Sequence, residues 1–161
     1  MFERLGNALG VLKEALAGLD HSRLSGEAAV DVVRMCTEAE RMLAATRTLA
    51  ARRVEESKVW QREGHRTAAH WVAAETGTFV GQAIGVLETG RRLEDLPLTK
   101  DAFCSGRLSE VQAREISEAA AADPGKERAL VDSAHTQTVK ALREECRRVR
   151  ATAVADEESR N

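Results

Sequence analysis

A helical pattern that continues without a break from about residue 25 to residue 60 constrains this fold most. About 35 residues at a rise of 1.5 Å each give a helix of roughly 52 Å, which exceeds the diameter of a compact domain of this size. Such a helix either protrudes from the domain or is covered by a second long helix. The sequence therefore predicts a long-helix arm over residues 25–60, with Ser25 as its N-cap.

The arm carries an apolar stripe with 3-4 spacing, which is typical of a helix that packs along one side. Cys36, Leu43 and Ala50 widen this stripe at seven-residue intervals. Two interpretations stay open: packing inside an intramolecular bundle, and a helix-to-helix seam in a homodimer. For the second, the predicted seam residues are Val32, Met35, Met42 and Leu49.

The composition favours helix over sheet throughout the chain. It contains no tyrosine and only two prolines, while Ala, Leu, Glu and Arg are abundant, and no stretch alternates apolar and polar residues. We expect an all-α multi-helix bundle that forms a single domain over residues 1–155, followed by a frayed tail at 156–161. The predicted helices span residues 2–19, 25–60, 68–76, 79–95, 99–105, 110–122, 126–134 and 137–154, and the first should bury Leu5, Leu9, Leu12 and Leu16.

The region from 66 to 122 contains two helical corners that resemble helix-turn-helix elements. In each, a small residue precedes a glycine by four positions: Ala73 with Gly77, and Ala102 with Gly106. Glycine can take the left-handed backbone conformation that such a turn requires. The corners are either packing features or DNA-reading elements, and in the second case Gln82 and Arg107 are the candidate contacts.

The predicted helix over 137–154 has a basic stripe beside its apolar one. Lys140, Arg143, Arg147 and Arg150 repeat with the 3-4-3 spacing of one helix face. These cations either pair with acids of a neighbouring helix or follow the phosphates of duplex DNA. The net charge of −2, and an excess of acids over bases in residues 61–122, predict that any DNA contact is weak.

Other classes of function find little support in the sequence. His65 and His70 lack further ligands at metal spacing, no nucleophile has a histidine and an acid nearby, and no cofactor motif is present. The chain contains no run of about 18 apolar residues, so no membrane span is predicted. The N-terminus does not have the pattern of a signal peptide, and three distant cysteines suggest reduced core thiols. We therefore expect a cytoplasmic protein that is not itself an enzyme.

Four ordered blocks between residues 68 and 151 resemble the N-terminal helical domain of the actinobacterial thirteen-E-twelve repeat family. The blocks are AAHWVAAETG, ETGRRLEDLP, AFCSGRLSEVQAREI and VKALREECRRVRA, with Trp71, Leu93, Pro97, Gly106, Leu108 and Ser109 as the matching positions. The resemblance covers about residues 25–157. It implies a helical domain of unknown function that members of the family join to a C-terminal HNH endonuclease.

The chain departs from that family in the part that would carry catalysis. An HNH site needs histidine and asparagine side chains around one divalent metal. Here no histidine follows His135, and the asparagines are Asn7 and Asn161. We expect a fragment of a longer endonuclease or a stand-alone domain. Its role would be that of a non-catalytic accessory domain in DNA targeting or assembly. The alternatives are a dimerisation module without nucleic-acid contact and a helix-turn-helix transcriptional regulator.

Overall fold

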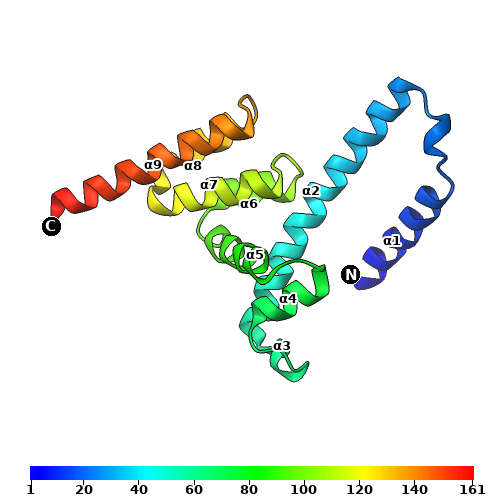
Figure 1. Cartoon of the computed structure of the whole chain (residues 1–161), viewed down its shortest axis with the longest axis horizontal. Coiled ribbons are helices and arrows are strands. Elements are labelled where there is room, and N and C mark those ends of the chain that lie inside the picture. The colour runs from blue at the N-terminus through cyan, green and yellow to red at the C-terminus, as the bar shows by residue number, and fades with distance from the viewer. The chain divides into compact units, whose positions relative to one another are not determined.

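The computed structural model describes all residues from 1 to 161, and every regular element in it is helical (Figure 1). This confirms the predicted all-α fold. The α-helices are α1 (Phe2–Ala17), α2 (Gly26–Ser57), α3 (Val59–Arg62), α4 (Ala68–Thr76), α5 (Val80–Leu93), α6 (Pro97–Cys104), α7 (Glu110–Ala122), α8 (Glu127–Ala134) and α9 (Val139–Arg160), with short 3₁₀ helices η1 (His21–Arg23) and η2 (Pro124–Lys126).

The chain separates into two compact units, residues 1–37 and residues 38–161. The boundary falls within α2, so the predicted arm contributes to both units. The single domain over residues 1–155 therefore stays a prediction.

The first unit, which contains α1, η1 and the start of α2, has no buried side chain. Within this unit, the prediction that α1 buries its leucines is therefore wrong. These side chains are 41–57% exposed: Leu5, Leu9, Leu12 and Leu16. The amphipathic pattern is real, but nothing within the first unit buries the apolar face of α1.

The larger core of the second unit is built around α7, which packs against α5, α6, α8 and α9. Alanines on α7 let these neighbouring helices approach closely, and Ile116 fills the space between them. The buried apolar side chains of this cluster are Ala44, Ala45, Leu93, Ala102, Phe103, Leu108, Ala113, Ile116, Ala119, Leu130, Val131, Ala134, Leu142 and Cys146.

A second apolar cluster joins α4 and α5 to the end of α2. Its buried members are Ala51, Ala68, Ala69, Val72, Ala73, Ala83 and Leu87. Trp60 and Trp71 pack against it but stay partly exposed, and each indole N–H finds a local acceptor, Glu55 O and Glu63 Oε2 respectively. Both tryptophans thus lie at the periphery of this cluster.

Both corners have the glycine geometry that the sequence predicts. The φ angles of Gly77 and Gly106 are +67° and +81°, in the left-handed region that side chains disfavour. At the second corner, Ser109 Oγ accepts the Gln112 N–H at 3.1 Å, and Gln112 Oε1 accepts the Ser109 N–H at 2.8 Å. This capping box starts α7 at the predicted residue.

Several helix ends differ from the prediction, and three of them have a clear physical reason. The long helix stops at Ser57, because Lys58 takes a left-handed conformation with a φ of 59°. α6 begins at Pro97, whose fixed φ suits the first turn of a helix. The tail that was expected to fray is helical through Arg160, since the segment Ala155–Arg160 contains neither glycine nor proline.

Candidate interaction surfaces

The basic row on α9 is divided between paired and unpaired cations. Arg143 Nε donates to Glu115 Oε1 on α7 at 2.9 Å, and Arg150 Nη1 lies 3.6 Å from Glu118 Oε2 on the same helix. Lys140 and Arg147 are exposed and have no carboxylate within 4.0 Å. For Arg143 and Arg150, pairing with a neighbouring helix is therefore the observed arrangement, while the other two cations remain available.

The two corner residues named as candidate DNA contacts serve local structure. Gln82 Oε1 accepts the Phe79 N–H at 3.3 Å and so caps α5. Arg107 donates to Asp101 Oδ2 at 2.8 Å and to Ser105 Oγ at 2.9 Å, which closes the end of α6. The carboxylate partner of Arg107 reduces its attraction for a phosphate or a base edge.

The four predicted seam residues have different environments. Met35 is 63% exposed and Val32 is half-buried. Met42 is 39% exposed, and its Cγ lies next to Gly106 at the second corner. Leu49 packs against the larger core of the same chain, so it is not free to contact a second copy. The free part of the stripe is therefore its N-terminal part.

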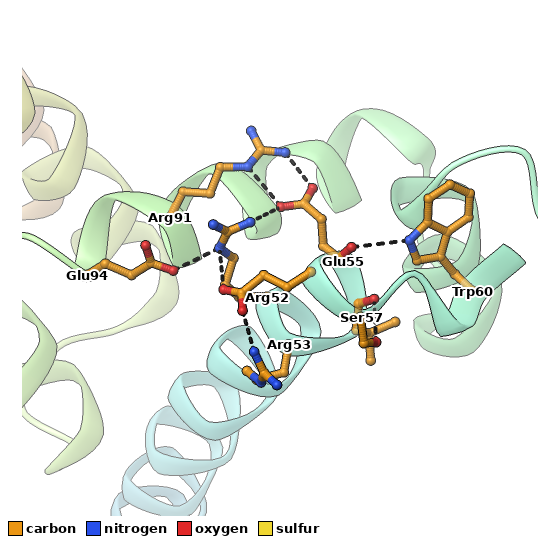
Figure 2. Close-up of polar contacts among 9 residues, drawn as sticks. Arg52, Arg53, Glu55, Ser57, Trp60, Arg91 and Glu94 are labelled. Carbon is orange, nitrogen blue, oxygen red and sulfur yellow. Dashed lines mark hydrogen bonds and ion pairs between the residues drawn. The ribbon is translucent and has the colours of Figure 1, made fainter.

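A network of charged side chains ties α2 to α5 (Figure 2). Arg91 Nε donates to Glu55 Oε1 at 2.9 Å, and Arg52 Nη1 donates to the same oxygen at 2.8 Å. Arg52 Nε also donates to Glu94 Oε1 at 2.8 Å. Arginines and glutamates alternate in the network, so each charged group lies next to a group of opposite charge. The network fixes α5 along the final turns of α2 and was not foreseen in the sequence.

The pKa values of the network follow its hydrogen bonds. The Arg91 guanidinium, and then Arg52, hold the pKa of the Glu55 carboxyl below its usual value, against the opposing effect of burial. The hydrogen bond from Arg52 likewise lowers the pKa of Glu94, and bonds to these acids raise the pKa of both arginines. The acids and bases therefore stabilise each other in their charged forms.

A cavity of about 280 Å³ lies where α2, α4 and α5 meet the start of α7. Thr78 and Gln82 of the first corner line it, together with Arg47, Glu110 and Arg114. Sequence reasoning considered Gln82 only as a reader of DNA bases and did not bring it together with Arg114. The approach of α7 to the first corner depends on tertiary packing, so spacing along the chain gives no sign of it.

The cysteines and histidines do not assemble a site. Cys146 is buried, whereas Cys36 and Cys104 are exposed, so the prediction of core thiols holds for one of three. Desolvation, followed by the nearby Glu115 carboxylate, raises the pKa of the Cys146 thiol to about 11. No group of three or more His, Cys, Asp or Glu side chains is arranged to hold a metal ion.

None of the helices combines the length and apolar character that a membrane span requires.

Comparison with known proteins gives no identification, since no family model, curated protein or solved structure matches this chain. The resemblance to the thirteen-E-twelve domain therefore stays a prediction. The most distinctive surfaces of the chain are the exposed apolar face of α1 in the N-terminal unit and the unpaired cations of α9.

Proposed function

We propose that this chain is a non-catalytic helical assembly module that associates with a second copy of itself through its N-terminal helices. One observation carries the proposal: residues 1–37 bury no side chain, although their apolar residues follow helical spacing. Single exposed leucines are common on protein surfaces, but an ordered row of them is typical of an interface. The row comprises Leu5, Leu9, Leu12 and Leu16 on α1, and the exposed Met35 at the start of α2 adds to it.

The spacing of the α1 leucines favours another helix as the occupant of this face. Their 4-3-4 intervals are those of a coiled-coil seam, which a helix of the same pattern complements. Residues 1–37 contain four basic and five acidic side chains, so two copies would repel each other little. Self-association lets identical stripes cover one another, as a two-fold symmetric interface requires.

The expected strength of this interface is modest. Burying the exposed half of each leucine contributes roughly 1 kcal/mol, or about 8 kcal/mol for eight leucines in two copies. That equals the free energy of a micromolar complex before the entropic cost of association is subtracted. The leucines of α1 are therefore not sufficient alone, and the α2 residues must contribute to a dimer that is stable at micromolar concentration.

Hydrogen exchange at two protein concentrations tests the proposal. A 16-residue helix without buried side chains is marginal in water, so α1 should gain protection only when it is covered. We expect the amides of α1 to exchange more slowly at about 100 µM than at about 1 µM protein, while those of α7 stay unchanged. Fast exchange of the α1 amides at both concentrations would contradict self-association through this helix.

The resemblance to the thirteen-E-twelve domain supports an accessory role for such a module. In that setting, association would bring together two copies of the protein to which the helical domain belongs. The proposal for this chain is thus assembly rather than catalysis, within a protein of the HNH-nuclease type.

The exposed α9 cations favour a second candidate function, which is weak contact with duplex DNA. Lys140 and Arg147 are two unpaired charges on one helix face, and each neutralised phosphate contributes about −0.9 to the log–log salt slope. Replacing both residues with alanine should therefore reduce the magnitude of the slope by about two. The titration uses any duplex at low salt.

The matched control is the double variant Arg62→Ala, Arg66→Ala, which removes the same charge from two exposed cations away from α9. If DNA lies along α9, this control keeps the wild-type slope. Absence of binding at low salt, or equal slopes for the two double variants, would rule out a specific role for α9.

A further inference from the structure

We propose that the cavity between the first corner and α7 binds a carboxylate carried on a short aliphatic stem. The cavity lies entirely within the second unit and has a volume of about 280 Å³. This is slightly below the range of pockets for drug-sized ligands. It therefore suits an organic acid of a few carbon atoms, or one acidic side chain.

The charges that line the cavity are not balanced. Arg114 has no carboxylate within 4.0 Å, and the nearest acid to Arg47 is Glu110, at a loose 3.7 Å. These are the only charged side chains of the lining, so its net charge is +1. Arg114 is also partly buried, and its guanidinium runs close to Gly85, which leaves room for it. A partly desolvated cation without a partner favours a bound monoanion.

The hydroxyl groups of the cavity have already used their hydrogens. Thr76, Thr89 and Thr48 each donate to a backbone carbonyl in the preceding turn of their own helix. Because the only hydroxyl hydrogen of Thr76 is used, the 2.8 Å contact between Thr76 and Thr78 requires Thr78 to donate. None of the four threonines therefore has a hydroxyl hydrogen left for a ligand.

The remaining donors belong to the two arginines and to Gln82. The Gln82 oxygen accepts the Phe79 N–H, so the free end of this amide is its NH₂ group. Two guanidinium groups and an amide NH₂ form a set of donors that matches the acceptor oxygens of a carboxylate. The capping bond thus assigns the orientation of Gln82 and makes it a donor toward the cavity.

Three valines provide the apolar part of the lining. They are Val72, Val86 and Val111. Val72 is only 2% exposed, so it belongs to the inner wall, and aliphatic contact there favours a carboxylate with a hydrocarbon stem over inorganic phosphate. The net charge of +1 favours a monoanion for the same site.

Pentanoate is the probe for this site, and pentanamide is its neutral control of the same size. Titration followed by the backbone and side-chain amide resonances of Gly85 and Gln82 should give saturable binding of pentanoate in the millimolar range. Pentanamide and inorganic phosphate should each bind at least about tenfold more weakly than pentanoate. Pentanamide lacks the charge, and phosphate lacks the aliphatic stem. Equal binding of either control would overturn the proposal.

Two substitutions test whether the proposed donors bind the carboxylate. Arg114→Gln should weaken pentanoate binding about tenfold or more. Gln82→Glu keeps the oxygen that caps Phe79 but replaces the donor with a negative charge, so it should abolish binding while the fold is retained. Arg128→Gln, on an exposed cation of α8 outside the cavity lining, is the matched control and should bind as the wild type does. Unchanged binding in the Gln82→Glu variant would contradict the proposal even if Arg114→Gln does not fold.

The ligand can be a free acid or the side chain of another protein segment. A glutamate with both termini blocked separates these sources. If it binds more tightly than pentanoate, the site takes an acidic side chain, and if it binds more weakly, the site takes a small free carboxylate. Failure of both carboxylate titrations, with pentanoate and with the blocked glutamate, would overturn this inference. It would leave the proposed self-association untouched, because the cavity and the α1 stripe share no residue.

Discussion

Gly106 occupies a position in the second corner that other residues would strain. Its φ is +81°, and a Cβ atom there would lie 3.2 Å from Met42 Cγ and 3.5 Å from the carbonyl oxygen of Glu38. A side chain would thus be disfavoured by the backbone conformation and by close neighbours on α2. The corner packs tightly against α2 because this residue is glycine.

Gly106→Ala should lower the free energy of unfolding by about 1–3 kcal/mol, measured by chemical denaturation. The control is Gly81→Ala in the first turn of α5, where a Cβ atom would meet open space and φ is not positive. Alanine there should be neutral or stabilising by up to about 1 kcal/mol. Equal effects of the two substitutions would mean that Gly106 is not constrained as described.

Residue types alone misplace some of the packing. Trp71 is the obvious core candidate from the sequence, but it is only partly buried, whereas Phe103 is fully enclosed. The leucines of α1 have an amphipathic pattern and remain exposed. A pattern tells which face of a helix is apolar, while the partner that covers this face is set by the tertiary fold, or by another chain.

At the scale of elements, the charged network is the main polar connection between α2 and α5. The hydrogen bond from Arg91 lowers the pKa of Glu55 below its usual value of 4.5. A depressed pKa means that folding favours the ionised carboxylate. Its contribution to stability is present above pH 4.5 and disappears as the pH falls through the lower pKa of the folded state.

Glu55→Gln should therefore destabilise the protein at pH 7, by about 1–3 kcal/mol, since Glu55 is largely enclosed and bonded to two arginines. The difference between wild type and variant should shrink as the pH falls below 4.5. Thermal unfolding from pH 7 to pH 3 measures it. A difference that is constant over this range would show that the Glu55 carboxylate contributes nothing through its charge.

Local signals predict elements well when the deciding residues are close in sequence. The caps Thr67 and Ser109 and the turn glycine Gly77 gave α4 and α7 their observed bounds. The break at Lys58 was missed, because a lysine in the left-handed conformation has no sequence signature. The network and the cavity were missed for another reason: they join residues such as Arg52 and Glu94, which only the packing of α5 on α2 brings together.

At the scale of the whole molecule, the two units differ in what holds them together. Residues 38–161 contain both apolar clusters, while residues 1–37 contain no buried side chain. Stability in water requires buried apolar surface, and we propose that a second copy of the chain supplies it for the N-terminal helices. This is the central claim of the proposed function.

Sedimentation equilibrium at tens of micromolar protein tests that claim most directly. The wild type should have twice the chain mass of 17.6 kDa. Leu9→Glu combined with Leu16→Glu should give the mass of a single chain with an unchanged melting temperature of the second unit, because neither residue contributes to a core cluster. The control Asn7→Glu, on the opposite side of α1, should remain a dimer. A wild-type mass of 17.6 kDa, or a double variant that keeps the dimer mass, would contradict assembly through α1.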